Sequence, residues 1–493
     1  MGPAGGGPTE SSSFLLHLLL GNVKEKPGIA RSFVVPSTQT PPHWLRLSNL
    51  DRVVNPTFTS AILFFTNLVS SSGNNHVDRT FSDVVEKLKE SLAKTLVDFY
   101  PLAGRLEVRE DGLVDLHCND QGAVFVEGSL DASLADVGGF GPMPALSGLE
   151  VAKLGPGPQY IPDQLTPMPV LVIQVTQFRK CGSVALAVNW HHTVADGSSG
   201  CHFMQSWAEM TMGKNLSLMP HHTRDLLMPR KVLNPSLVLN GYSTKNVEEL
   251  LPKGGAMEVM NEPTVLKSFL LTKDAAQGLK SMASSGDCEH TSAEAISGYL
   301  WKLMTKARKE IVNGDGDFGS MGQQHQQQQK QQTTRFFMFV DGRKKLALPA
   351  GYFGNVVCSA CAVSTEEEIL TKPLHYAADL IRKSMMNITR EYFRSLIDWV
   401  EEQRHAPPKS EHVNSLGHDV AATFWTFFPL YEMDFGWGKP SFATRNAGPR
   451  PLIDGIAMMP SPEGRGHMVA LINLHADRMD RLETDAAFSS VYS

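Results

Sequence analysis

The chain has 493 residues, of which 42% are hydrophobic and 19% charged, and its formal net charge at neutral pH is −6. This composition is typical of a globular protein and excludes the disordered and fibrous classes, while the length suffices for two or three domains. Because basic residues are not in excess, the sequence predicts binding neither to nucleic acid nor to an anionic lipid surface.

Cysteine content and hydropathy indicate a cytoplasmic protein. Six cysteines in a chain of this length do not form a disulfide framework and favour reduced thiols. Cys358 and Cys361 form one CxxC pair within an apolar run, but no second pair completes a zinc site, so we expect structural thiols and no metal. The apolar run 14–20 is shorter than the ~20 residues of a membrane-spanning helix, so we expect neither a span nor a signal peptide.

The first half of the chain is predicted to form one domain over residues 14–217, after a disordered lead-in of Gly, Pro and Ser at 1–13. Apolar residues recur at helical spacing over 82–99, with Ser82 as the expected N-cap, and Pro and Gly end this helix. Runs of strand-forming residues predict short strands at 31–35, 113–116 and 123–127.

The most informative stretch follows these elements. Two runs rich in Val, Ile and Leu, at 170–178 and 183–190, are joined by a turn and predict neighbouring strands. The second run leads directly into His191-His192-Thr-Val-Ala-Asp196-Gly, and 198–212 then shows helical periodicity. The sequence therefore places a histidine pair between the end of a strand and the start of a helix.

The second half is predicted to form another domain, residues 259–493, reached through a crossover at 218–258 that has no sustained periodicity. A Gln-rich segment at 313–334 cannot bury a core and predicts a flexible surface insertion. Helices are expected at 275–283, 292–312, 366–385 and 389–404, and strands at 265–271, 335–340, 355–363, 422–428, 453–459 and 467–474. Because strands and helices do not alternate strictly, we expect an α/β protein with mixed sheets rather than a doubly wound parallel sheet.

His192 and Asp196 form an H-x-x-x-D pattern at the end of the predicted strand. An imidazole titrates near neutral pH and can accept a proton from a hydroxyl or amine, so His192 is a candidate general base. The carboxylate of Asp196 could form an ion pair elsewhere and fix the turn that orients the ring. Alone, the pattern is weak, since a histidine in such a loop is more often structural.

A second motif, Asp434-Phe-Gly-Trp-Gly438, has no acid–base constellation. Gly436 and Gly438 indicate a tight turn, and Trp437 is expected to fill a core. Asp434 is therefore predicted to be structural.

Together the two motifs, about 240 residues apart, resemble the plant BAHD acyltransferase family. Further matches in the family's order extend over most of the chain: Val35-Pro36-Ser37, Leu47-Ser48-Asn49-Leu50-Asp51, Tyr100-Pro-Leu-Ala-Gly-Arg105, Trp301 with Lys306-Ala307-Arg308, Asp341-Gly-Arg343 and Gly351-Tyr-Phe-Gly-Asn355. Only the stretch before residue 31 and the Gln-rich segment fall outside this pattern.

The resemblance implies two similar-sized domains of chloramphenicol-acetyltransferase-like fold, with a channel between them and His192 at its centre. It implies direct transfer in a ternary complex, with acyl-CoA as a co-substrate, no permanently bound cofactor and no metal. A monomer is usual in such a family. The acceptor would be the hydroxyl or amine of a small specialised metabolite, and the overall motif set favours hydroxycinnamoyl as the acyl group.

The same resemblance implies roles for individual residues. Asp196 would point away from the channel and orient the histidine, paired with an arginine that the sequence does not identify. Thr423 and Trp425 would position the intermediate, and Thr59 would place a hydroxyl near the base. Contacts to CoA would come from Lys280, Ser281 and the helix start near residue 292.

The acceptor pocket is implied to lack an ionic anchor. Family members that act on shikimate-like acids carry polar residues beyond Thr59 and an arginine upstream of the tryptophan, and the nearest equivalents here are Ala61, Leu63 and Ser410. Without a guanidinium to bind a carboxylate, a neutral acceptor is expected.

Two other functions are compatible with the sequence. The His-His-x-x-x-Asp-Gly pattern also resembles condensation domains of peptide synthetases, although those have carrier partners. Alternatively, the chain could be a non-catalytic, BAHD-like accessory protein of lipid metabolism. The presence of His192 favours an enzyme.

Overall fold

The computed structural model describes residues 29–69, 79–137, 167–237, 241–244, 264–284, 289–309, 332–405, 409–410, 418–445 and 454–492. The predicted lead-in at 1–13, the apolar run 14–20 and residues 313–331 of the Gln-rich segment lie outside these ranges. The final residues of that segment were predicted to be loop, but Thr333 and Thr334 begin a strand.

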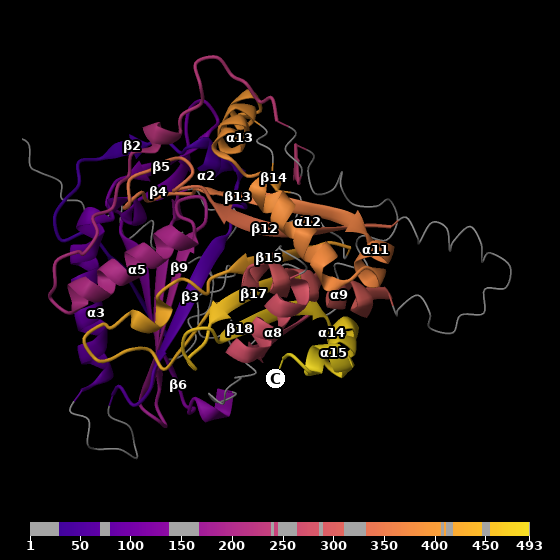
Figure 1. Cartoon of the computed structure of the whole chain (residues 1–493). Helices are drawn as coiled ribbons and strands as arrows, with labels where there is room; N and C mark the ends of the chain where they lie inside the picture. The colour runs from indigo at the N-terminus through magenta and orange to yellow at the C-terminus, as the bar shows by residue number, and fades with distance from the viewer. Residues whose placement is uncertain are drawn as a thin grey trace, which may run out of the picture.

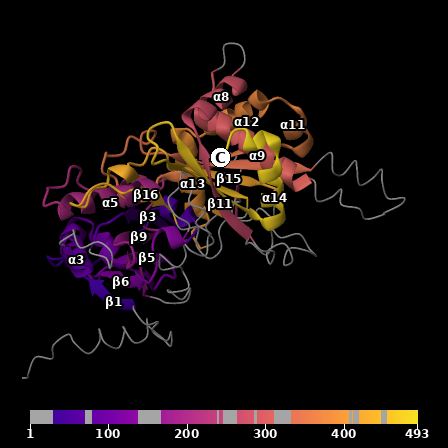
Figure 2. The same cartoon turned by 90° about the horizontal axis from the view of Figure 1, so that it is seen from below.

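Two six-stranded sheets organise the molecule (Figure 1). In spatial order, the first sheet contains β1 (Ile29–Val34), β6 (Ala123–Leu130), β8 (Leu171–Phe178), β9 (Ser183–His191), β3 (Phe58–Phe65) and β16 (Phe442–Thr444). The second contains β11 (Thr264–Leu271), β18 (Met468–His475), β17 (Gly455–Pro460), β15 (Val420–Phe424), β12 (Thr333–Asp341) and β13 (Val357–Thr365). Strand β16 thus comes from the C-terminal part of the chain but pairs with β3 in the first sheet (Figure 2).

Both sheets are mixed, as the sequence predicted. In the first sheet β6 and β8 are parallel, whereas β9 pairs antiparallel with both β8 and β3. In the second, β15 runs parallel to both β12 and β17, and the outer pairs are antiparallel. Smaller pairings join β2 (His43–Leu45), β5 (Val114–Cys118), β4 (Arg105–Val108) and β7 (Met168–Pro169), and separately β10 (Tyr242–Ser243) and β14 (Lys409–Ser410).

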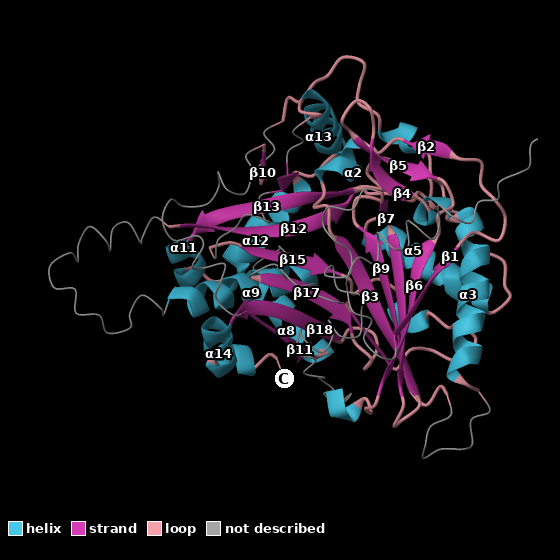
Figure 3. Cartoon of the chain, turned by 180° about the vertical axis from the view of Figure 1, so that it is seen from behind, coloured by secondary structure: helices cyan, strands magenta, loops and turns pink. Residues whose placement is uncertain are grey.

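Helices cover one face of each sheet (Figure 3). The first sheet packs against α3 (Phe81–Asp98) and α5 (Gly197–Thr211). Around the second sheet lie α8 (Lys273–Ala283), α9 (Ser292–Lys309), α11 (Glu366–Thr371), α12 (Leu374–Met386), α14 (Ala476–Thr484) and α15 (Ala486–Ser489). A further helix, α13 (Arg390–Glu402), contacts α2 (Asn49–Val53) of the first half. Short 3-10 helices span Tyr100–Ala103, Ala135–Val137, Arg224–Leu227 and Leu430–Glu432.

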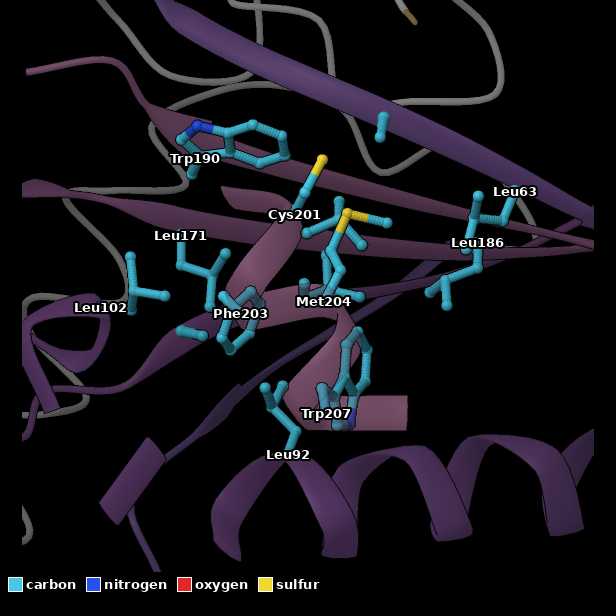
Figure 4. Packing of buried hydrophobic residues seen from close by; sticks show 14 of the residues in the cluster. Leu63, Leu92, Leu102, Leu171, Leu186, Trp190, Cys201, Phe203, Met204 and Trp207 are labelled. Atoms are coloured by element: carbon cyan, nitrogen blue, oxygen red, sulfur yellow. The ribbon is translucent and has the colours of Figure 1, made fainter. Parts of the chain in front are cut away.

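The core of the first half lies between its sheet and α5, where large side chains of the helix face both the strands and α3 (Figure 4). Trp207 stacks against Phe203 with ring centroids 6.1 Å apart. Its indole N–H donates to Ser91 Oγ on α3 over 3.0 Å. The buried tryptophan therefore has its polar group satisfied, as close packing of an aromatic residue requires.

Several predicted boundaries were wrong for local reasons. Thr80, not Ser82, caps α3, because the Thr80 hydroxyl accepts from the Asp83 backbone while the Asp83 carboxylate accepts from the Thr80 backbone. The helix predicted at 366–385 is two helices, since Pro373 ends α11 and precedes α12. The strand predicted at 422–428 ends at Phe424.

Strand β3 was missed altogether, although it is central to the first sheet. Its residues from Thr59 to Phe65 are all buried, so apolar residues occupy both faces and no polar alternation marks the strand. Cys358 and Cys361 lie on β13 as predicted strand residues, and neither forms a disulfide within the described residues. Their spacing of three places them on opposite faces of the sheet.

We predict that Gly200→Ala destabilises the protein. A Cβ atom at Gly200 would lie 2.2 Å from two ring atoms of Trp190, which is fully buried beneath α5. Overpacking of this kind lowers the free energy of unfolding by about 1–3 kcal/mol, which thermal and denaturant unfolding would measure. The control is Gly278→Ala in α8, where no atom lies within 4 Å of an added Cβ. Equal stability of the two variants would contradict the packing described for α5.

Candidate active site

The two adjacent histidines have different environments because successive residues of an extended chain point to opposite sides. His191 is buried, and its ring lies edge-on against Phe58 with centroids 5.2 Å apart. Burial lowers the pKa of His191 to about 3, so it stays neutral. His192 retains partial exposure, and its backbone N–H donates over 2.7 Å to Thr57 O, just before the start of β3. Only His192 is therefore accessible for chemistry.

Asn355 holds the imidazole of His192. The Asn355 amide nitrogen donates to Asp51 Oδ1 over 2.9 Å and to the carbonyl of His192 over 2.7 Å. Since both amide hydrogens are thus used, Asn355 Oδ1 is the atom that faces His192 Nδ1 at 3.1 Å, and Nδ1 must donate to it. The proton on Nδ1 leaves Nε2 with a free lone pair, which is the state a general base requires.

Asp51 fixes Asn355 in turn. Asp51 Oδ1 accepts from both the backbone and the side-chain nitrogen of Asn355, each over 2.9 Å. Its other oxygen accepts from Arg224 Nε over 3.0 Å and from the Ser48 hydroxyl at the start of α2. Arg224 also donates to the carbonyls of Val194 and Phe353. The segment around the base is thus held by residues from three distant parts of the chain.

The arginine that pairs with Asp196 is Arg343. Its two terminal nitrogens contact the two Asp196 oxygens over 2.8 and 2.9 Å, a bidentate geometry. Asp196 also caps α5 by accepting from Ser199 N over 2.9 Å, and it accepts from Val356 N over 3.0 Å. Its carboxylate therefore faces Arg343 and the start of α5, and it organises the turn that carries His192.

The electrostatics of this site favour a neutral imidazole. Desolvation lowers the pKa of His192, and the charge of Asp196 and the hydrogen bond to Asn355 offset this only in part. Burial also disfavours ionisation of Asp196, but Arg343 and the two backbone donors outweigh it, so the pKa of Asp196 remains below its ordinary value. The site thus contains an ionised, paired carboxylate behind an unprotonated histidine.

Trp425 lies beside the strand that carries the base. It is buried directly after β15, and its ring stacks on Trp190 of β9 with centroids 6.2 Å apart. No hydrogen bond of its indole N–H is found among the residues described. Thr423, two residues earlier, is half-buried on β15. Thr59 is buried on β3 directly opposite Trp190, which puts both side chains on the same face of the sheet.

The Asp434 motif forms a tight turn. Asp434 Oδ1 accepts from the backbone of Gly436, Trp437 and Gly438 over 2.7, 3.1 and 2.9 Å. Gly436 and Gly438 have φ values of +89° and +102°, which a side chain would strain. Phe435 packs edge-on against Trp207 at 5.2 Å. The turn therefore attaches this C-terminal segment to the core of the first half.

Lys280 and Ser281 lie away from this network, on α8 in the helical layer of the second sheet (Figure 1). Lys280 pairs with Glu289 over 3.7 Å, and the Ser281 hydroxyl bonds to the Gln277 carbonyl of its own helix. The structure does not bring them together with His192.

Sequence reasoning missed the roles of Asn355, Arg343 and Asp51. Each belongs to a motif that matches the family's pattern, so the sequence did contain a signal for their importance. Their partners were not deducible, because the contacts join Arg343 to Asp196 and Asn355 to Asp51 across separations of 147 and 304 residues.

We predict that Arg343→Met destabilises the fold strongly, because it leaves the carboxylate of Asp196 buried and unpaired. Loss of one partner of a buried ion pair costs about 3–5 kcal/mol. Denaturant unfolding of Arg343→Met, of Asp196→Asn and of the double variant would measure the coupling, and the double variant should recover part of the loss. Lys344→Met, at an exposed neighbouring position, is the control. Additive effects of the two substitutions would contradict the pairing.

Comparisons with known proteins give matches over almost the whole chain. The Transferase family model matches residues 28–489. The chain is 33% identical to a hydroxycinnamoyltransferase of Narcissus pseudonarcissus, over 94% of this chain and 98% of the relative, and 32% identical to the shikimate O-hydroxycinnamoyltransferase of Nicotiana tabacum, over 92% and 97%.

Among solved structures, vinorine synthase has the same fold, with a TM-score of 0.67 and 21% identity over 94% of this chain and 97% of that one. F. sporotrichioides TRI101, complexed with coenzyme A and T-2, gives a TM-score of 0.68 at 17% identity over 91% and 99%. Among the residues described, no helix has the length and hydropathy to span a membrane. The family match, the two-domain fold and the relatives together show that the chain belongs to the BAHD transferase family and is an acyl-CoA-dependent acyltransferase.

Proposed function

We propose that the protein transfers a hydroxycinnamoyl group from its CoA thioester to a hydroxyl or amine of a small molecule, with His192 as the general base. The observation that carries this proposal is the orientation of the imidazole, whose Nδ1 donates to Asn355 so that Nε2 keeps its lone pair. The choice of acyl group is supported by relatives that are named hydroxycinnamoyltransferases.

The proposed reaction takes place in a ternary complex. His192 Nε2 accepts the proton of the acceptor hydroxyl or amine as its oxygen or nitrogen attacks the thioester carbonyl. The resulting tetrahedral intermediate carries a negative oxygen, for which the Trp425 indole N–H and the Thr423 hydroxyl are the proposed donors. When the intermediate collapses, the C–S bond breaks, and the CoA thiolate takes the proton from the imidazolium. The neutral base is thereby regenerated.

The remaining roles are proposals of the same kind. Lys280 and Ser281 would contact CoA after its approach to α8, and Thr59 would lie beside the acceptor. The division into domains at 14–217 and 259–493 would separate the halves that bind the two substrates, with β16 crossing back to the first sheet.

We predict that purified protein releases CoA thiol from p-coumaroyl-CoA only when an acceptor is present, and that His192→Ala loses this activity. Removal of a general base lowers the rate about 10²–10⁴-fold. The control is His375→Ala, a partly exposed histidine on α12. Retention of acceptor-dependent release in His192→Ala would contradict the assigned base, and binding of CoA without release from any acceptor would favour an accessory protein.

The same assay has a predicted pH dependence. Because desolvation lowers the pKa of His192, the imidazole stays neutral below the pH at which an ordinary histidine gains its proton. Activity should fall as pH decreases through that pKa, since the protonated ring cannot accept a proton, and the midpoint of log kcat/KM should lie below the ordinary histidine value of about 6.5. A midpoint above that value would contradict the desolvated site.

A further inference from the structure

Arg445 lies at the edge of the first sheet, the sheet whose strand β9 leads to His192. It directly follows β16, which runs antiparallel to β3 with Phe442 opposite Phe64 and Thr444 opposite Ile62. The direction of β16 therefore leads Arg445 toward the start of β3, where Thr57 O accepts from the backbone of His192. Arg445 therefore places a positive charge near His192, although no motif marks its segment of the sequence.

The guanidinium of Arg445 lies against Trp425. Its Cζ atom is 5.5 Å from the centroid of the indole, the distance of a cation–π contact. Trp425 in turn stacks on Trp190, two residues before His192. Arg445 also affects the base directly, because its positive charge is one of the causes that lower the pKa of His192. Arg445 therefore contacts the indole beside the strand of the base, and its charge acts on the imidazole of His192.

Arg445 lacks a counter-ion within the described part of the chain. Its Nε is shielded from solvent and has no hydrogen-bond partner there. Other shielded arginines of the described chain have acceptors: Arg224 binds Asp51, Arg343 binds Asp196, and Arg105 donates to three backbone carbonyls. Burial lowers the pKa of Arg445 to about 10, which leaves it charged at neutral pH without compensation. An unpaired, desolvated guanidinium is a strong site for an anion, and its planar donors match a carboxylate.

The chemistry of the substrates restricts which anion can reach this position. The phosphates of CoA are separated from the thioester by the whole pantetheine arm, so they cannot lie beside the base when the thioester carbonyl does. A hydroxycinnamoyl group carries no carboxylate. The acceptor is the remaining substrate whose anionic group can lie near the nucleophile that His192 deprotonates.

We propose that Arg445 binds a carboxylate of the acceptor, so that the acceptor is a hydroxy acid or an amino acid rather than a neutral alcohol. This proposal rests on the proposed function and names its acceptor class. It replaces the expectation of a neutral acceptor, which depended on the absence of an arginine at Ser410 and on Ala61 and Leu63 as pocket residues. Both side chains are fully buried in the hydrophobic core of the first half and cannot line a pocket.

The test compares carboxylic acids with their methyl esters as acceptors. With p-coumaroyl-CoA as donor, kcat and KM would be measured for shikimate, 5-hydroxyanthranilate and 4-hydroxyphenyllactate, each beside its methyl ester. Wild-type protein should favour at least one acid over its ester by roughly 30-fold or more in kcat/KM, the effect expected for a buried charge pair. In Arg445→Met this ratio should fall toward one, mainly through a higher KM for the acid, and Arg445→Lys should retain part of it.

The control is Arg465→Met, an exposed arginine in the turn between β17 and β18, which should keep the wild-type ratio. A wild-type enzyme that uses esters as well as acids would overturn the proposal without any variant, as would an unchanged ratio in a folded Arg445→Met. A dependence on Arg445 seen with malonyl-CoA and neutral acceptors would assign the carboxylate to the donor and also overturn it. If the enzyme turns over acceptors but does not prefer acids to their esters, only this inference is contradicted. If no acceptor is turned over, the proposed function is contradicted as well.

Discussion

Two ion pairs are buried beside His192, and they hold the segments that orient its imidazole. The same site must also keep that imidazole neutral. Asp196 and Arg343, and Asp51 and Arg224, are removed from water, and each pair is stabilised by further hydrogen bonds from backbone groups. Removing a carboxylate or guanidinium from water costs free energy unless an opposite charge and hydrogen bonds compensate for it. Small movements of these side chains would therefore destabilise the protein. The same desolvation lowers the pKa of His192 and keeps its lone pair available.

These pairs also join the two halves of the chain. His192 and Asp196 follow β9 of the first sheet, whereas Arg343 and Asn355 lie between β12 and β13 of the second. The base is therefore oriented only when the halves are assembled. The Asp434 turn and β16 make a second connection, from the C-terminal segment to the core around Trp207. Arg445 directly follows β16, so the strand that attaches the C-terminal segment to the first sheet also positions a guanidinium near His192.

Much of the fold could be predicted because local patterns were strong. The strands before His192 and the helix after Asp196 were recognised from apolar periodicity and turn residues. Strand β3 could not be, because burial on both faces removes the alternation that marks a strand. The start of α3 was misplaced by two residues because both Thr80 and Ser82 are plausible caps, and only the reciprocal bonds with Asp83 distinguish them.

The candidate site was predicted only in its local part. The resemblance supplied His192 and an orienting role for Asp196, but a partner 163 residues away, such as Asn355, emerges only from the folded chain. Arg445 belongs to no motif, and its significance comes from a folded environment in which the described residues supply no counter-ion, which no sequence pattern reports.

The central claim is that Asn355 fixes the tautomer of His192, and nitrogen NMR of protein labelled with ¹⁵N in the histidine rings tests it most directly. Comparison with His192→Gln would assign the signals of this ring. The structure predicts, at pH 7.5, a neutral imidazole with its proton on Nδ1 and none on Nε2. A proton on Nε2, or a doubly protonated ring at that pH, would contradict the account.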